Sequence, residues 1–364
     1  MIRSRRAPLK GVNKMVSKLS DMQWHEVEEL GRAGMRGKAI KDELDLDLHP
    51  ANINKHLQLK GIGATGEVAE LTLAEARRAQ LEQLFAKPLD SPPIKIEKLK
   101  DGARVVIASD FQLPFSQPGL VGGVDNKVGA FEAFLADYDP ALVILNGDIR
   151  DCYSLSSFDR DPSRRFGEKE EKRLTQNELR AINKAAPRAR KIFHSGNHEA
   201  RLERTYAQLC QKDSRAFEIF SALGFETLNT RSMLNLDDLG YEYQPYSGWT
   251  DVLGLIVTHG DLIGHESGET ARKIYEKWKS SAVVGHSHRL AAFFHTDAQG
   301  KAHAVYEGGC MCRLDGLGYT VNPNWQNGWI IGEVHGGLLH TQLVPVFDDR
   351  FWVPGVGSYK LGTK

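Results

Sequence analysis

The side chains best suited to chemistry stand at the ends of five apolar runs. These runs are RVVIASD, ALVILNGD, RKIFHSGN, GLIVTHGD and SAVVGHSH. They carry two carboxylates, one amide and three imidazoles: Asp110, Asp148, Asn197, His259, His286 and His288. Mixed oxygen and nitrogen donors of this kind suit manganese, iron, zinc or nickel. Because two carboxylates and three imidazoles are too many ligands for one ion, the pattern predicts two divalent metal ions about 3.5–4 Å apart.

The five runs are expected to be strands of an α/β domain that begins near Asp101. Fully apolar runs suit strands buried on both faces of a helix-covered sheet, and open α/β sheets place their sites at the carboxyl ends of strands. The later segments RLAAFFH, KAHAVYEG, GWIIGEV and LHTQLVPV have no helical segments between them. They are expected to be antiparallel strands of a second sheet packed on the first.

Four motifs resemble, in the same order, those of the calcineurin-like metallophosphoesterase superfamily. They are Gly147-Asp148-Ile149-Arg150-Asp151, Gly196-Asn197-His198-Glu199, His259-Gly260 and Gly285-His286-Ser287-His288. The resemblance covers residues 103–345, and GNHEARLER and GCMCRLDGLGY…NWQNGW also resemble a branch common in phages and prophages. It implies a four-layer α/β/β/α sandwich over residues 101–364, and a small all-α helical domain is expected before it.

The resemblance also implies a role for each ligand. Asp148 would bridge both ions, Asp110 and His288 would hold the first ion, and the second ion would be held by Asn197, His259 and His286. His198 would bind no metal and would act as general acid or transition-state donor beside the phosphate. Asp151 would orient the His198 ring. Mn²⁺ is the expected ion, with iron, zinc or nickel as alternatives.

The stretch KIFHSGNHEA is then interpreted as a strand followed by the turn that places Asn197 and His198 in the site. Gly196 is expected to allow a tight turn after the strand, and His194 is expected to be structural. Glu199 and Arg201 have three open interpretations: a surface salt bridge, a role in fixing the turn, or contact with substrate.

One position departs from the family pattern. The first motif is normally Asp-x-His, whereas this sequence has Asp110-Phe111-Gln112. An amide oxygen binds these ions more weakly than imidazole does. Gln112 is therefore expected either to be a weak metal ligand or to hydrogen-bond a metal-bound water.

Arginines near the motifs are candidate substrate contacts: Arg150, Arg164, Arg165 and Arg201. Residues 152–190 form a long charged insert. Two interpretations stay open for it, a solvated helix pair and a lid or basic rim that grips a phosphate.

The N-terminal hundred residues have a different organisation. Residues 1–18 hold six basic residues and no acid, which predicts a flexible basic arm or a nucleic-acid arm. The periodicity over 19–64 predicts a helix-turn-helix-like domain, with Pro50 in the first turn of the candidate recognition helix. Its candidate DNA contacts are Asn52, Asn54, Lys55 and Gln58. A plain helical hairpin explains the same pattern.

Residues 65–100 are expected to be a helix, opened by a capping box at Thr72, and a Pro-rich linker.

The composition is that of an ordinary globular protein without a disulfide scaffold or a membrane span. Of the 364 residues, 41% are hydrophobic and 26% are charged, and the formal net charge is +0, so charge alone points to no particular partner. The four cysteines do not suggest a disulfide scaffold, and Cys310 and Cys312 are read as alternating thiols on a strand rather than as a metal motif. No segment is long enough to span a bilayer. We therefore expect an intracellular protein, in the cytoplasm of a bacterial or phage-infected cell, with no membrane partner.

Together these features predict a dinuclear-metal phosphoesterase in which a metal-bridging hydroxide attacks a phosphate ester. The N-terminal helices and basic arm favour a nucleic acid or nucleotide substrate, cleaved by phosphodiesterase, nuclease or terminal phosphatase activity. The alternative is a DNA-binding regulatory protein whose phosphoesterase domain is inactive or weakened.

Overall fold

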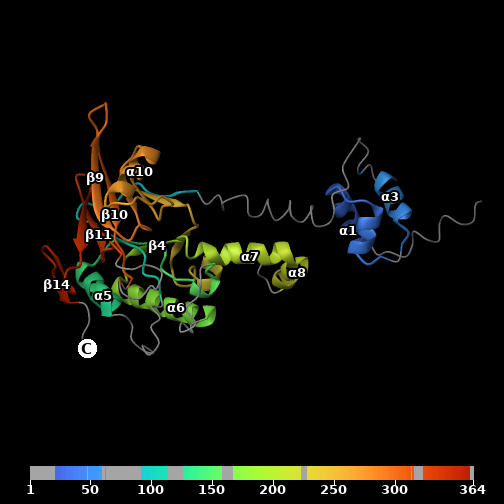
Figure 1. Cartoon of the computed structure of the whole chain (residues 1–364), viewed down its shortest axis with the longest axis horizontal. Coiled ribbons are helices and arrows are strands. Elements are labelled where there is room, and N and C mark those ends of the chain that lie inside the picture. The colour runs from blue at the N-terminus through green and yellow to red at the C-terminus, as the bar shows by residue number, and fades with distance from the viewer. Residues whose placement is uncertain are drawn as a thin grey trace, which may run out of the picture. The chain divides into compact units, whose positions relative to one another are not determined.

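The computed structural model describes residues 21–46, 48–59, 62, 92–113, 126–157, 167–222, 228–312, 314 and 323–360 (Figure 1). By its residue contacts the chain divides into two compact units. One comprises residues 1–87 and 209–219, and the other comprises residues 88–208 and 220–364. The predicted basic arm and the capping box at Thr72 lie outside the described residues.

Three short helices make up the described N-terminal part of the first unit: α1 (Asp21–Arg32), α2 (Gly37–Glu43) and α3 (Pro50–Leu59). Pro50 begins α3, where its missing N–H would have no helical partner in any case. The apolar faces of the helices form one core from Val27, Met35, Ile40, Leu46, Leu48, Ile53 and Leu57. The Gly37 amide also donates to Asn54 Oδ1 at 2.6 Å, which ties α2 to α3. The predicted N-terminal helices are therefore present.

Two six-stranded sheets form the second unit. The first sheet has the order β12-β11-β2-β3-β4-β5, with strands β2 (Arg104–Ala108), β3 (Leu142–Asn146), β4 (Arg190–His194), β5 (Glu242–Gln244), β11 (Gly328–His335) and β12 (Leu338–Pro345). Strands β2 to β5 run parallel, and β11 and β12 add an antiparallel edge.

The second sheet has the order β1-β6-β7-β8-β10-β9. Its strands are β1 (Ile94–Ile96), β6 (Trp249–Val252), β7 (Leu255–Thr258), β8 (Ala282–Val284), β9 (Leu290–Thr296) and β10 (Ala302–Gly308). β8 pairs in parallel with both β7 and β10, whereas β9 pairs antiparallel to β10 at the edge.

The division of strands between the sheets differs from the prediction. The late antiparallel segments do not make a second sheet of their own, because β9 and β10 join one sheet and β11 and β12 join the other. The five apolar runs are also divided, with β2, β3 and β4 in the first sheet and β7 and β8 in the second. The predicted ligands therefore come from both sheets.

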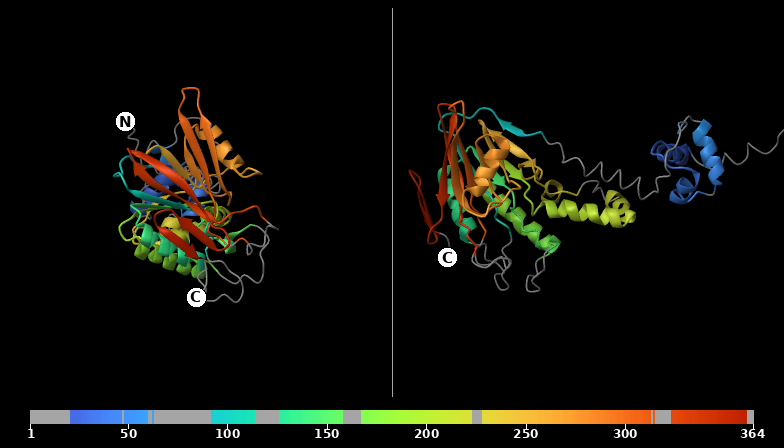
Figure 2. Two further views of the ribbon diagram at one scale, coloured as in Figure 1. Left: turned by 90° about the vertical axis from the view of Figure 1, so that its left-hand side faces the viewer. Right: turned by 45° about the horizontal axis from the view of Figure 1, so that its top comes forward.

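Helices cover the outer face of each sheet, which makes four layers. On the first sheet, Phe131 and Phe134 of α5 (Asn126–Tyr138) and Leu179 of α6 (Glu168–Ala185) share one core with strand residues such as Phe193. A second core, which includes Ile107, lies between the sheets. α10 (Glu269–Trp278) packs on the other sheet. Figures 1 and 2 show α10 and the α5–α6 pair on opposite sides of the sheets. The predicted α/β/β/α sandwich is confirmed.

The remaining elements are the 3₁₀ helix η2 (Tyr153–Leu155), the helices α7 (Ala200–Lys212), α8 (Ser214–Ala222) and α9 (Thr230–Leu234), and the hairpin of β13 (Arg350–Val353) and β14 (Gly357–Lys360). The predicted linker over 65–100 overlaps the sandwich, because β1 pairs with β6 in the second sheet. Among the described residues, no helix combines the length and apolar character that a membrane span needs.

Phe134 offers a test of the α5 layer. Its side chain is fully buried and contacts the Trp329 ring at a centroid distance of 5.4 Å. Phe134→Ala should lower the free energy of unfolding by about 3–5 kcal/mol, because it removes apolar contacts and leaves a cavity. Urea denaturation measures the loss. Phe294→Ala is the matched control, since Phe294 is 70% exposed and should lose little. Equal losses for both variants would show that α5 does not pack as described.

Candidate functional site

The predicted ligands follow the carboxyl ends of strands from both sheets, and the backbone beyond these ends holds them together. The segments after β2 and β3 continue to pair, since the amide of Asp110 donates to the Gly147 carbonyl at 2.9 Å and that of Gln112 donates to the Asp148 carbonyl at 2.8 Å. The second sheet joins them where the His286 amide donates to the Asp110 carboxylate at 3.0 Å. The site therefore lies where the two sheets meet.

One group of ligands gathers around Asp148. His259 Nε2 is 3.3 Å from Asp148 Oδ2 and 3.1 Å from Asn197 Oδ1. Ligand atoms of Asp148, His259 and His286 all lie within 4.8 Å of one another. These four residues could hold one metal ion with two oxygen and two nitrogen donors.

A second group gathers around Asp110. His288 Nε2 is 3.1 Å from Asp110 Oδ1 and 3.2 Å from Gln112 Nε2. Gln112 Oε1 is buried and has no hydrogen-bond partner among the described residues, so it could serve as an oxygen ligand beside the other two. Gln112 therefore lies where the family pattern has a histidine, and its amide could complete a site with Asp110 and His288.

Most of these ligands sit on strained backbone. Asp110, Gln112, Asp148, His286 and His288 have φ angles of 56°, 50°, 53°, 66° and 58°, in the left-handed region. For residues other than glycine, this conformation costs about 1–3 kcal/mol each and persists only where the surroundings enforce it. The turns thus hold the ligand side chains in a geometry that an isolated chain would not adopt.

The charges of the site favour a bound cation. The Asp110 and Asp148 side chains are 0% and 1% exposed. Burial would raise the pKa of Asp148, but His198 and His259 hold this pKa below its usual range. Burial would likewise lower the pKa of His259, yet the nearby carboxylates, Asp148 above all, raise it to about 10. Two buried carboxylates that draw in positive charge, together with the orphaned Gln112 oxygen, fit divalent metal ions.

His198 lies beside the ligands rather than among them. Its Nδ1 is 2.8 Å from the Asp151 carbonyl and 3.1 Å from Asp151 Oδ1, so the ring can donate its Nδ1 proton to Asp151. Its Nε2 lies 3.7 Å from Asp148 Oδ2 and 3.2 Å from Arg201 Nη2. Burial acts to lower the pKa of His198, but Asp148 and the hydrogen bond to Asp151 raise it overall. The arrangement is the one that an orienting role for Asp151 requires.

Glu199 fixes the turns and is not part of a surface salt bridge. Its buried carboxylate accepts three backbone N–H bonds, from Gly196 at 2.8 Å, Asp148 at 3.0 Å and Arg150 at 2.8 Å. Two ligand-bearing loops, after β3 and after β4, are thereby tied to one side chain. Of the three interpretations that the sequence left open for Glu199, the structure supports the fixing of the turn.

Arg150 does not reach the site as a substrate contact would. Its side chain is fully buried, and Nη2 donates to Glu168 Oε2 at 2.5 Å while Nε lies 3.6 Å from Glu171 Oε1. The guanidinium is therefore paired with carboxylates of α6. Arg201 is different, since it lies beside His198 and also donates to the Asp151 carbonyl at 2.8 Å. Arg164 and Arg165 lie outside the described residues.

The candidate DNA contacts occupy α3 in the other unit. Lys55 and Asn54 are exposed and Asn52 is half-buried, whereas the Gln58 side chain lies outside the described part. Asn54 already accepts the Gly37 amide, so its carboxamide helps to hold the helices together. Among the described candidates, Lys55 and Asn52 are thus better placed than Asn54 for an outside partner.

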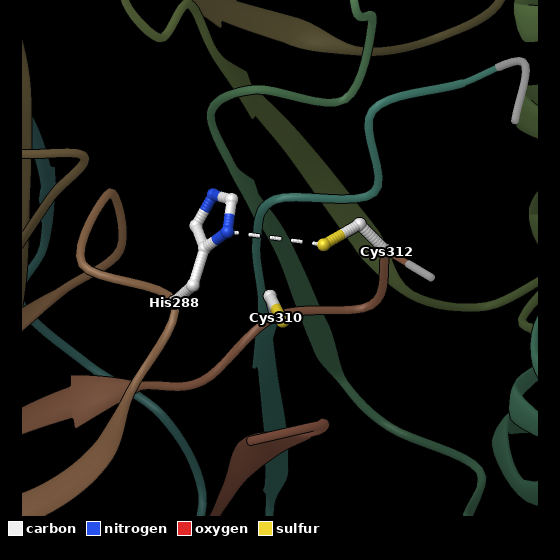
Figure 3. A group of neighbouring side chains, drawn as sticks. All are labelled: His288, Cys310 and Cys312. Carbon is white, nitrogen blue, oxygen red and sulfur yellow. Dashed lines mark hydrogen bonds between the residues drawn. The ribbon is translucent and has the colours of Figure 1, made fainter. Parts of the chain in front are cut away.

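Sequence reasoning missed the groups that lie beside Nδ1 of two predicted histidine ligands. His259 Nδ1 is 2.8 Å from the Asn146 carbonyl, and His288 Nδ1 is 3.8 Å from Cys312 Sγ (Figure 3). Such partners keep the ring proton on Nδ1 and leave Nε2 for a metal. A backbone carbonyl leaves no sequence signal. Cys312 was visible in the C-x-C motif, but it lies in a bend rather than on the predicted strand.

His194 is buried between the strands as a structural residue. Its Nδ1 is 2.8 Å from Asn146 Oδ1 and its Nε2 is 2.8 Å from Thr250 Oγ1. Burial lowers its pKa to about 3, which keeps the ring neutral. The residue therefore links the two sheets behind the site.

Gly196 provides a test of how tightly these loops approach. A turn follows Gly196, as predicted, but its φ is not in the left-handed region, so the glycine is needed for space rather than for an unusual backbone conformation. A Cβ there would overlap Asp148 Oδ1 and the Asp148 backbone nitrogen. Gly196→Ala should therefore displace Asp148 and abolish binding of Mn²⁺ near Asp148, as measured by titration. Gly129→Ala, with open space around its Cβ, is the control. Unchanged metal binding in Gly196→Ala would refute the close approach.

Comparisons with known proteins identify the family of this chain. The family model described as calcineurin-like phosphoesterase matches residues 103–312. The gene 54 proteins of Mycobacterium phages D29 and L5 are each 26% identical to the chain over 267 residues, which cover 69% of the chain and 97% of each phage protein. They support the predicted resemblance to a phage-type branch. Among solved structures, Vps29 of Chaetomium thermophilum aligns with 68% of this chain and 92% of its own, at 11% identity and a TM-score of 0.36. Because the family model spans more than half of the sequence, the chain belongs to the calcineurin-like phosphoesterase family and is a metal-dependent phosphoesterase.

Proposed function

We propose that this phosphoesterase uses two divalent metal ions to hydrolyse a phosphate ester of a nucleic acid or nucleotide. The observation that carries the two-metal part is the pair of adjacent ligand groups, which the Asp110 carboxylate and the His286 amide connect at 3.0 Å. Asp110, Gln112 and His288 would hold the first ion. Asn197, His259 and His286 would hold the second, with Asp148 between them. Mn²⁺ is the expected ion for this mixed donor set, with iron, zinc or nickel as alternatives.

Two such ions would supply positive charge for the phosphoryl oxygens and activate water for in-line attack. The protein's own side chains would act on the leaving oxygen and on the charge of the phosphate. His198 Nε2 faces the site, 3.7 Å from Asp148 Oδ2, where it would act as general acid or transition-state donor beside the phosphate. Asp151 holds the other ring proton and so fixes which nitrogen faces the substrate. Arg201, beside His198, would offset the charge of the phosphate.

The substrate class rests on the other unit. α3 presents the exposed Lys55 and the half-buried Asn52, and the sequence before α1 is strongly basic. A helix with such side chains, together with a basic segment, suits the phosphate backbone of DNA. A unit that binds nucleic acid would bring phosphodiester bonds or terminal phosphates to the enzyme.

The proposed roles are tested by one set of measurements on the whole protein. Wild type loaded with Mn²⁺ should contain about two ions per chain. It should hydrolyse some member of a panel of phosphate mono- and diesters that includes single- and double-stranded DNA. His198→Ala should lower turnover by about 10²–10⁴-fold and leave the metal content unchanged. Asp148→Ala should lose both ions, because its carboxylate would be shared by the two ions.

Three outcomes would contradict these roles. Loss of metal in His198→Ala would show that His198 is a ligand. A stoichiometry near one would show that Gln112 does not support the first ion. Protein that binds DNA but hydrolyses no ester on the panel would favour the alternative, a DNA-binding regulator with an inactive phosphoesterase domain.

Lys55 tests the nucleic-acid part. Lys55→Glu should weaken DNA binding by the whole chain and should reduce the slope of log affinity against log salt by about 1, because one phosphate contact is lost. Fluorescence anisotropy over a salt series measures both effects. Lys301→Glu, an exposed lysine of the other unit, is the control. If both variants bind DNA as wild type does, α3 serves only to pack the helices.

A further inference from the structure

His288 is the metal ligand with the least usual surroundings. On its Nε2 side it meets Asp110 Oδ1 at 3.1 Å and Gln112 Nε2 at 3.2 Å. On its Nδ1 side it meets the sulfur of Cys312 at 3.8 Å (Figure 3). The Cys312 side chain is fully buried, and His288 is 5% exposed. The ring is thus held between the proposed first metal and a thiol.

The segment that carries Cys312 is fixed to the same part of the site. Asn327 Nδ2 donates to the carbonyls of Cys310 at 3.0 Å and Cys312 at 2.7 Å. The amide of Met311 lies 3.2 Å from the Ser109 carbonyl and 3.1 Å from the Asp110 carbonyl. The backbone of Asp110 and the ring of His288 are therefore located by one short segment, so Cys312 has a defined position relative to both ligands.

We propose that Cys312 is a positioning residue for the first metal ion, and that it acts by accepting the Nδ1 proton of His288. This rests on the proposed role of His288 as a ligand. A histidine that binds metal through Nε2 must carry its remaining proton on Nδ1, and that proton usually goes to a carboxylate, a carbonyl or water. Here the acceptor is sulfur. The bond fixes both the tautomer and the rotation of the ring, which matters more at this ion because Gln112 is a weaker ligand than imidazole.

Cys310 has a different role, although its sulfur is near. Ligand atoms of His288, Cys310 and Cys312 lie within 4.8 Å of one another, a spacing that a separate soft-metal site could also have. However, Cys310 Sγ donates to the Gln326 carbonyl at 3.5 Å and accepts from Asn327 Nδ2 at 3.6 Å. Figure 3 shows the Cys312 sulfur turned toward His288 and joined to its ring by a dashed line. Cys310 is therefore a matched control, a buried thiol of the same segment whose sulfur is engaged by Gln326 and Asn327.

Metal affinity provides the first test. Free Mn²⁺ followed by electron paramagnetic resonance during titration of the full chain resolves two sites of different affinity. Cys312→Ala should weaken one of them by about 10–100-fold and leave the other unchanged, as is usual for loss of a ligand's hydrogen-bond partner. Cys312→Ser, which keeps an acceptor on a shorter side chain, should recover part of the loss. Cys310→Ala should bind both ions as wild type does.

A spectroscopic readout separates positioning from a general effect on stability. In zinc-loaded protein with ¹⁵N-labelled histidine, the His288 Nδ1 proton should exchange slowly with solvent in wild type and in Cys310→Ala. In Cys312→Ala it should exchange faster, because its acceptor is gone. Cobalt-loaded wild type should show no strong thiolate-to-metal charge-transfer band.

Several results would overturn the proposal. These are unchanged Mn²⁺ affinity in Cys312→Ala, equal losses in Cys312→Ala and Cys310→Ala, or a charge-transfer band that disappears with Cys312, which would make the sulfur itself a ligand. Failure of the proposed function is a separate outcome. If wild type binds two ions but hydrolyses no ester, the proposed function fails, and the affinity and proton-exchange comparisons still decide the role of Cys312. If wild type binds no metal, the proposed function and the proposed role of Cys312 are both overturned.

Discussion

Asp110 and Asp148 carry carboxylates that are almost completely removed from water, and such charges are stable only beside opposite charge or hydrogen-bond donors. Their surroundings meet this requirement with backbone amides and imidazoles. The amide of His286 donates to Asp110 at 3.0 Å and the amide of His198 donates to Asp148 at 2.8 Å. These bonds connect loops that follow strands of both sheets. The need to compensate two buried carboxylates thus draws together the loops that make the site.

The site is also costly in backbone conformation, and the surrounding network offsets that cost. Five of the predicted ligand residues have left-handed φ angles, which cost about 1–3 kcal/mol each outside glycine. Glu199 counters this strain by accepting three N–H bonds from the loops after β3 and β4. Gly196 permits the close approach, because any side chain there would meet Asp148. The four-layer sandwich supplies the rigidity on which these contacts depend, since cores lie between the sheets and under the helices on both outer faces.

A buried charge cluster joins the loop after β3 to the helix α6. Arg150 follows Asp148 by two residues, and its guanidinium contacts Glu168 and Glu171 of α6. Burial raises the pKa of Glu171 to about 8, against the opposing effect of Arg150. Removing one partner of such a cluster would leave an uncompensated charge in the interior, which is far more costly than the pair itself. The carboxylates of α6 therefore help to fix, through Arg150, the position of the loop that carries Asp148 and Asp151.

The sequence by itself determined the chemistry of this protein. Three features are local: the polar ends of the apolar strands, the order of the motifs, and Pro50 at the start of α3. Local features can be recognised in the sequence without knowledge of the fold. Tertiary structure decided what depends on distant partners. It divided the five site-bearing strands between two sheets, buried Arg150 against α6 instead of exposing it to substrate, and placed Cys312 beside His288. None of these could be read from spacing, because strand pairing and side-chain contacts join residues far apart in the chain, and a local pattern carries no record of the partner that it meets.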